Sequence, residues 1–185
     1  MRARIFILGI LIAWFLSSCE KINIDGLMED FGLDFSTDYY EIPLVIVPAP
    51  AGFEVSFSTP MQSDMDNLLA ARGYSNATIT SIQMADASMT IDEKSNITNF
   101  NAVELITTSI STPVLPEEMI ASFENTLEDA ENVTMETPGT ELADYLTNDE
   151  YILVTTGKLK EDLTDTLRIK GKIRYRISFN IASLE

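Results

Sequence analysis

Apolar and polar residues alternate over the last long stretch of the chain, residues 167–181. Leucine, isoleucine or an aromatic residue occupies almost every odd position, whereas five even positions form what we call the cationic row: Arg168, Lys170, Lys172, Arg174 and Arg176. Successive side chains of a β-strand point to opposite faces, so the pattern predicts a strand with one apolar and one cationic face. Gly171 keeps the phase of the alternation, which predicts a bend or a closely approaching neighbour, not an inserted bulge residue.

Shorter runs of β-branched, aromatic and alternating residues predict further strands upstream. Pro43 interrupts the first of them, which favours an edge strand or a bulge, because proline cannot donate a ladder hydrogen bond. We expect strands at residues 39–47, 53–58, 78–84, 88–92, 102–111 and 151–159. The strand at 151–159 is the expected hairpin partner of 167–181.

Three segments carry helical signals. Ser63 can cap a helix that stops at Gly73, and Pro116 opens a segment, ending at Leu127, whose apolar residues recur at helical spacing. A shorter helix is expected at residues 141–146. Many short strands with turns between them predict a mainly β fold, an antiparallel β-sandwich with two or three short helices.

The N-terminus has a different pattern. Arg2 and Arg4 precede an apolar run, Ile5–Leu16, of about 12 residues, which is too short to span a bilayer and is typical of a secretion signal. Leu16-Ser17-Ser18-Cys19 closes the run and resembles the lipobox of bacterial lipoproteins. The resemblance implies that residues 1–18 are cleaved and that Cys19, the only cysteine, carries diacylglyceryl and amide-linked acyl groups such as palmitate. Such chains hold a protein at a membrane without a transmembrane helix.

Residues 19–38 carry an excess of acidic side chains, which predicts a tether between the lipid and the domain. Apolar residues in the same stretch favour, as the alternative, a short helix or an arm packed on the domain. Acidic residues just after the lipidated cysteine resemble the export signal of surface-displayed lipoproteins in some Gram-negative bacteria. That resemblance implies an outer-membrane protein facing the cell surface. Residues 39–185 are expected to form a single β-rich domain.

Net charge narrows the choice of partners. The chain has 12 Lys and Arg against 29 Asp and Glu, and loss of the two leader arginines leaves 10 basic residues and a net charge of −19. Such a charge argues against nucleic-acid binding and against electrostatic adhesion to anionic lipids. The expected partner is the membrane, which the chain reaches through the lipid anchor that the lipobox resemblance implies and not through its charge.

The cationic row stands out against this acidic background. Like charges about 7 Å apart on one strand face repel by roughly 0.5 kcal/mol per neighbouring pair. Carboxylates from other predicted strands can offset the repulsion, and the candidates are Glu41, Glu54, Asp92 and Glu104. One interpretation is therefore a solvated, ion-paired face. The alternative is an anion-binding face for an acidic glycan, a lipid headgroup or an acidic protein partner.

Catalytic chemistry has little support in the sequence. The chain has no histidine, its single cysteine belongs to the lipobox, and it contains no glycine-rich phosphate loop or dinucleotide motif. Acidic clusters at 64–67 and 92–96 offer oxygen ligands for Ca²⁺ but lack the pattern of an EF-hand loop. Helix capping explains the first cluster and a turn explains the second. We therefore expect no enzymatic activity, no metal and no cofactor.

These observations together predict a lipid-anchored cell-envelope protein that acts as a non-catalytic binding or scaffolding module. The alternative is a periplasm-facing lipoprotein for envelope assembly or lipid handling, in which the sandwich encloses an apolar groove. A glycosidase built on two carboxylates is a third alternative.

Overall fold

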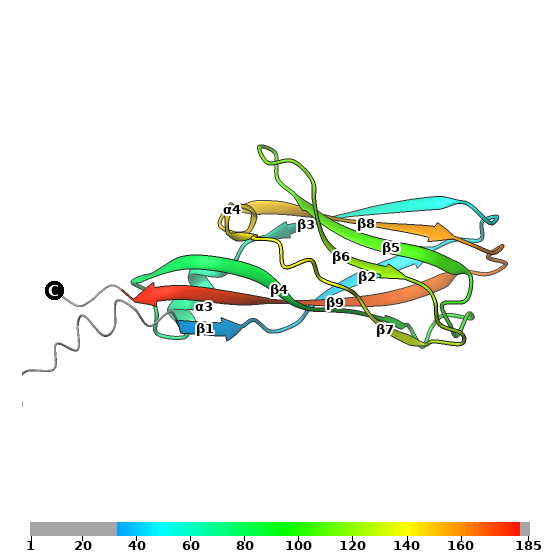
Figure 1. Ribbon diagram of the computed structural model, residues 1–185, viewed down its shortest axis with the longest axis horizontal. Coiled ribbons are helices and arrows are strands. Elements are labelled where there is room, and N and C mark those ends of the chain that lie inside the picture. The colour runs from blue at the N-terminus through cyan, green and yellow to red at the C-terminus, as the bar shows by residue number, and fades with distance from the viewer. Residues whose placement is uncertain (1–32, 182–185) are drawn as a thin grey trace, which may run out of the picture.

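Two antiparallel β-sheets stack face to face in residues 33–181, the part of the chain that the computed structural model describes (Figure 1). Sheet A contains β1 (Leu33–Ser36), β2 (Tyr40–Ile46), β9 (Leu167–Ile181), β4 (Ala77–Ile91) and β7 (Asn132–Thr134). Sheet B has the order β3 (Glu54–Gln62), β8 (Glu150–Leu159), β5 (Val103–Ser111) and β6 (Glu118–Glu124). The predicted mainly β, antiparallel sandwich is confirmed.

Strand β9 lies in the middle of sheet A and has the bounds that its alternation predicts. It pairs with β4 along one side and with β1 and β2, placed end to end, along the other. Its odd positions from Leu167 to Phe179 are buried between the sheets, where Tyr175 and Ile177 have no exposed surface. Gly171 keeps both ladders in register, since it pairs with Ile42 on one side and Met89 on the other. The prediction that Gly171 is no bulge residue is confirmed.

The partner of β9 differs from the prediction. β8 lies in sheet B, so residues 151–159 are not the hairpin partner of β9. Residues 160–166 carry the chain from one sheet to the other, and the buried Leu163 pairs there with Ala49. Neighbouring strands form a hairpin when a tight turn joins them, whereas this connection is long enough to cross the roughly 10 Å between stacked sheets.

The segment 116–127 contains a strand, Glu118–Glu124, instead of the predicted helix. β6 occupies the middle of this segment and pairs with β5. Ile120 and Phe123 are buried, as they would be on a helix, but Met119 and Leu127 are exposed. Pairing with β5 supplies backbone hydrogen bonds and burial that outweigh the local helix signals.

The structure also bears on the predictions for β4 and β2. The predicted strands 78–84 and 88–92 join into the single strand β4, whose ladder with β9 has irregularities at two places. Among the strands of residues 33–181, β2 pairs with β9 alone, so the edge position that Pro43 predicts is confirmed.

Two helices, α3 (Met65–Ala71) and α4 (Ala143–Leu146), occur among the described residues. Gly73 has a φ of +84° just after α3 and ends it as predicted. The predicted cap is wrong, because Asp64 occupies the N-cap position without a side-chain cap hydrogen bond. The Ser63 hydroxyl instead donates to a carbonyl of α4. Neither helix is long and apolar enough to cross a membrane.

The boundary between the acidic segment and the folded domain lies earlier than predicted. Residues 33–36, assigned to the tether on sequence grounds, form β1 and pair with β9. Phe35 is half-buried, with its ring centroid 5.8 Å from that of Phe179, so apolar burial favours this arm. The alternative of an arm packed on the domain therefore fits these four residues. Cys19 and the rest of the segment, up to residue 32, lie outside the described residues.

Candidate functional site

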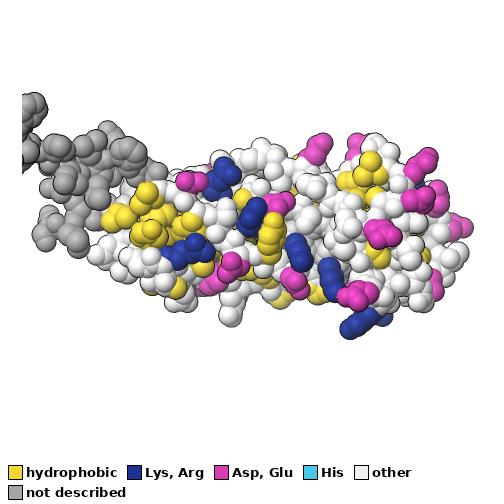
Figure 2. Space-filling model, turned by 90° about the horizontal axis from the view of Figure 1, so that it is seen from below, with side chains coloured by type: hydrophobic (Ala, Val, Ile, Leu, Met, Phe, Trp, Pro, Cys, Tyr) yellow, Lys and Arg dark blue, Asp and Glu magenta, His cyan; other side chains and the backbone are white. Residues whose placement is uncertain are grey.

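All five side chains of the cationic row lie on the outer face of sheet A, as the alternation predicts. Arg168, Lys172 and Arg176 are exposed, whereas Lys170 and Arg174 are half-buried. In Figure 2 basic side chains follow one another along the molecule and acidic side chains lie beside them. The row is therefore accessible to solvent, and its function depends on whether the neighbouring acids form ion pairs with it.

Four members of the row have a carboxylate within ion-pair distance. The pairs are Lys170–Asp92 at 3.3 Å, Lys172–Glu41 at 3.9 Å, Arg174–Asp86 at 3.6 Å and Arg176–Asp34 at 3.9 Å. Within residues 33–181, Arg168 is the member of the row without such a partner. The acids come from β1, β2 and β4 and from the residue after β4, so both neighbours of β9 contribute.

Of the four acids proposed from the sequence, two belong to the row. Glu41 and Asp92 pair with it, but Glu104 forms an ion pair with Lys158 of β8, at 2.7 Å. Glu54 also lies in sheet B, opposite Lys158 in the β3–β8 ladder. The error follows from the strand order, because β3 and β5 flank β8 and not β9.

Register explains the two acids that the sequence analysis missed. Asp86 lies directly opposite Arg174 in the β4–β9 ladder, and directly opposed side chains on one face are close enough to interact. Asp34 is two positions away from the residue opposite Arg176, a diagonal neighbour. Neither position is visible without knowing that β1 and β4 are the neighbours of β9.

Tyr39 adds an aromatic ring to the row beside Arg174. Its hydroxyl donates to Asp86 at 2.6 Å, and the Arg174 guanidinium carbon lies 4.8 Å from the ring centroid. The hydrogen bond to Asp86 raises the pKa of Tyr39. Arg174 is thereby held between a ring and a carboxylate, while its buried Nε has no hydrogen-bond partner among the described residues.

This geometry favours the ion-paired interpretation of the row. The cations are spread along one strand about 7 Å apart and do not converge on one point. Four of the five already face a carboxylate, so an approaching anion meets acids as well as bases. The row can tie β9 to the strands on both of its sides and keep the outer face of sheet A soluble, and within the described residues it has no enclosed subsite for one ligand.

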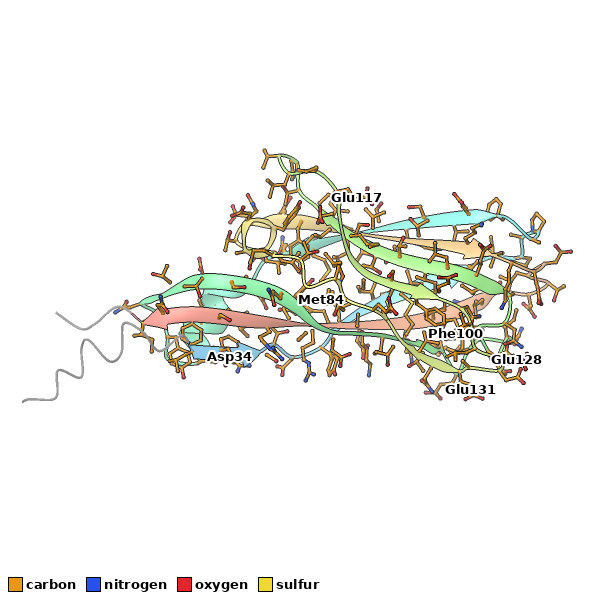
Figure 3. The ribbon with its side chains drawn as sticks, viewed as in Figure 1. Asp34, Met84, Phe100, Glu117, Glu128 and Glu131 are labelled. Carbon is orange, nitrogen blue, oxygen red and sulfur yellow. The ribbon has the colours of Figure 1, made fainter. Side chains whose placement is uncertain are left out.

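A second feature, which the sequence analysis missed, is the group of loops at the end of the sandwich opposite β1. We call them the distal loops; they are residues 47–53, 92–102, 125–131 and 160–166 (Figure 1). They hold eight acids against Lys94 and Lys160, and those acids are Asp92, Glu93, Glu128, Asp129, Glu131, Glu161, Asp162 and Asp165. Figure 3 shows Glu128 and Glu131 at this end and Asp34 toward the other.

Side-chain hydrogen bonds tie the distal loops to one another. Asn101 Nδ2 donates to Asp129 at 2.9 Å, and the backbone N–H of Asp129 donates back to Asn101 Oδ1 at 2.9 Å. Asn96 donates to Asp165 at 2.9 Å and lowers the pKa of that carboxyl. The buried Asn125 donates to the carbonyls of Phe100 and Val103. These loops are thus cross-linked into one acidic surface, for which asparagine- and aspartate-rich turns were the available sequence signal.

The two acidic clusters considered for Ca²⁺ have different explanations. Asp92 accepts the backbone N–H of Lys94 at 2.8 Å, a bond that lowers the pKa of Asp92, so the predicted turn is confirmed. Asp64 does not cap α3, which makes the capping explanation wrong; it accepts the Tyr40 hydroxyl at 3.0 Å.

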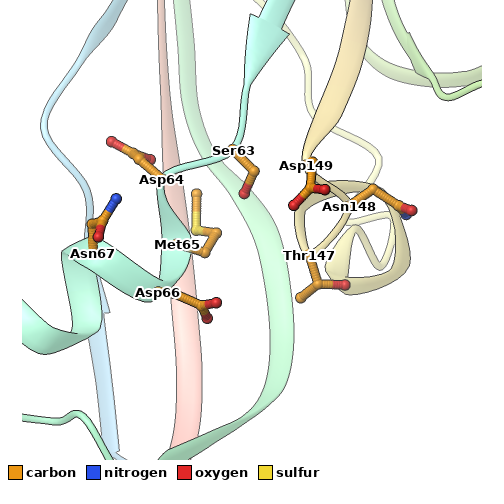
Figure 4. Close-up of a pocket in the computed structure, with 8 residues that line it drawn as sticks. All are labelled: Ser63, Asp64, Met65, Asp66, Asn67, Thr147, Asn148 and Asp149. Carbon is orange, nitrogen blue, oxygen red and sulfur yellow. The ribbon is translucent and has the colours of Figure 1, made fainter.

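A polar cleft lies next to Asp64, between the start of α3 and the α4–β8 turn (Figure 4). Its volume is about 260 Å³, and its lining includes Asp64, Asp66 and Asp149. Among residues 33–181, no group of three or more carboxylates is arranged to hold a metal ion.

Comparisons with known proteins do not name a family. No protein-family model matches the chain, and no curated protein matches it. Among solved structures it is similar to the coat protein of Tobacco streak virus, at 11% identity over 78% of this chain and 90% of that chain, with a TM-score of 0.25. A match with so low a TM-score carries no conclusion about function.

Proposed function

We propose that this chain is a lipid-anchored protein of the bacterial outer membrane, displayed at the cell surface, that works as a non-catalytic binding or scaffolding module. The lipobox-like Leu16-Ser17-Ser18-Cys19 supports the anchor. The observation that carries the proposal is that β1 and the distal loops lie at opposite ends of the molecule. The chain enters the sandwich through β1 at one end, and the distal loops gather at the opposite end (Figure 1).

That arrangement directs the distal loops away from the membrane that the anchor occupies. Loops positioned by a rigid scaffold are the usual place of binding residues in β-sandwiches. Here the loops are cross-linked by Asn101, Asp129, Asn96 and Asp165, so less conformational entropy is lost when a partner binds. A cationic partner fits their acidic surface better than the anionic partner considered for the cationic row.

The alternative of lipid handling has less support. An acyl chain needs an apolar cavity between the sheets, but the cavity lined by Leu44, Val55 and Phe57 measures about 10 Å³. That is about the space of a single water molecule.

Metabolic labelling tests the anchor. Cells that express the full chain and a Cys19→Ser variant are grown with a clickable palmitate analogue, and the protein is recovered and imaged. We expect the native chain to be labelled and to partition into detergent, and the variant to do neither. An unlabelled native chain, with a known lipoprotein labelled in the same cells, would contradict the proposal.

A further inference from the structure

A groove lined by both apolar and charged side chains lies at the β1 end of the molecule. It has a volume of about 300 Å³ and is lined by Leu33, Asp34, Phe35, Arg72, Tyr74 and Phe179. Figure 2 shows apolar side chains gathered at this end, whereas acidic side chains gather at the other. The groove is thus separated from the distal loops by the length of the sandwich.

Three aromatic rings form the floor and wall of the groove. The Tyr74 and Phe179 centroids are 4.8 Å apart, and those of Phe35 and Phe179 are 5.8 Å apart. Leu33 at the rim is 39% exposed, although apolar side chains of its size are usually buried. The groove therefore leaves apolar surface in contact with water within the described structure.

The charges of the groove fit a phosphate. The Arg72 guanidinium carbon lies 4.1 Å from the Phe35 centroid, so the ring holds the side chain at the rim. No carboxylate of residues 33–181 forms an ion pair with Arg72, whereas the one acid of the groove, Asp34, faces Arg176 at 3.9 Å. A guanidinium with free N–H groups binds phosphate oxygens in a bidentate manner.

The length of chain before the groove limits how far it can lie from the anchor. Cys19 is 14 positions before Leu33, and even a fully extended chain of that length spans at most about 50 Å. Leu33 itself lines the groove, so no other part of the described surface is closer to Cys19 along the chain.

We propose that this groove rests on the bilayer surface in which the lipid anchor lies, with Leu33 and the aromatic rings at the acyl-chain boundary and Arg72 at a lipid phosphate. The inference rests on the proposed function, because the anchor supplies the high local concentration of lipid. Apolar and aromatic side chains with a basic residue beside them are favoured at the boundary between lipid headgroups and acyl chains. The contact turns the acidic distal loops away from the bilayer.

A tryptophan reporter tests the contact, because the only tryptophan, Trp14, leaves with the leader. Leu33→Trp is introduced into the lipidated protein, which is reconstituted into phosphatidylcholine vesicles with or without bromine on the acyl chains. We expect bromine to quench the fluorescence of Leu33→Trp. Phe53→Trp is the matched control, since Phe53 is 44% exposed but lies in the distal loops, and its fluorescence should not change.

The outcomes separate the inference from the proposed function. If the protein floats with the vesicles but bromine leaves Leu33→Trp unquenched, the inference is wrong, and another part of the chain or a second copy covers the groove. If the protein does not float, the anchor is absent and the proposed function fails as well. Arg72→Glu, made in the Leu33→Trp background, should weaken the quenching without changing the circular dichroism spectrum. Unchanged quenching would contradict the role of Arg72.

Discussion

Gly171 lies against the backbone of β2 in the middle of sheet A. A Cβ atom at this position would be 3.2 Å from the Ile42 carbonyl oxygen, so Gly171→Ala requires the backbone of β2 to shift by a few tenths of an ångström. We expect it to lower the free energy of unfolding by about 1–3 kcal/mol, the usual cost of overpacking. Gly157→Ala is the matched control, because its Cβ would meet side-chain atoms of Val55 and Ile46, which can rotate. Urea unfolding measures both, and equal losses would contradict the close approach.

Two buried tyrosines, Tyr151 and Tyr175, and the half-buried Tyr40 make the free energy of unfolding depend on pH in the alkaline range. Burial raises the pKa of Tyr151 from 10.0 to about 12, and it also raises the pKa values of Tyr40 and Tyr175. A tyrosine whose pKa is higher in the folded state stabilises the fold fully below the unfolded pKa, and this contribution is lost as pH rises through the folded pKa.

The free energy of unfolding should therefore fall as pH rises above about 10, which is the unfolded pKa. Tyrosinate absorbance, followed against pH in native buffer and in denaturant, measures the same effect. We expect fewer ionised tyrosines in the native chain than in the unfolded chain between these two pKa values. Superimposable titration curves would show that the hydroxyls are not protected.

Among the elements, β9 was predictable and β6 was not, for a physical reason. β9 repeats one alternation over 15 residues, and a slip by one position would bury the whole cationic row. β6 has only 7 residues, and a proline with two glutamates before its apolar residues imitates a helix start. Partners are harder still to predict, since the strands that pair with β9 come from distant parts of the chain.

The same limit applies to the candidate site. Alternation places the five cations on one face, but two of their acids, Asp34 and Asp86, depend on strand order and register. The distal loops need four connections to meet at one end, which is a property of the whole topology. The sequence shows which side chains are polar, whereas the topology decides which of them meet.

Neutralising the middle of the cationic row tests whether it is an ion-paired face. The triple variant combines Lys170→Gln, Lys172→Gln and Arg174→Gln. The control variant combines Lys94→Gln and Lys160→Gln, which removes positive charge from the distal loops and leaves the cationic row intact. We expect the triple variant to lose some stability, with the loss shrinking at high salt, because exposed pairs are weak and screened.

Dextran sulfate binding provides the second readout for these variants. Neither the native chain nor the triple variant should bind this polyanion, because the net charge is negative and four of the five cations in the row already face a carboxylate. A native chain that binds it, together with a triple variant of unchanged stability that does not, would restore the anion-binding face and contradict the ion-paired interpretation.

At the scale of the whole molecule, the distribution of charge and the position of β1 favour the same orientation at a membrane. The chain has a net charge of −17, and eight of its acids lie in the distal loops, far from β1. An acidic end is repelled by an anionic membrane surface, whereas the groove at the β1 end offers aromatic rings and Arg72. The proposed anchor, groove and loops therefore favour one orientation, with the distal loops pointing outward.

Labelling of a single cysteine on intact cells tests this account most directly. Glu128→Cys places a thiol in the distal loops, and Cys19, the only native cysteine, is expected to be acylated. A membrane-impermeant maleimide is added before and after the outer membrane is permeabilised, with a periplasmic cysteine protein as the control. The account predicts full labelling of Glu128→Cys on intact cells, while the control stays unlabelled. Labelling only after permeabilisation would contradict surface display and favour the periplasm-facing alternative.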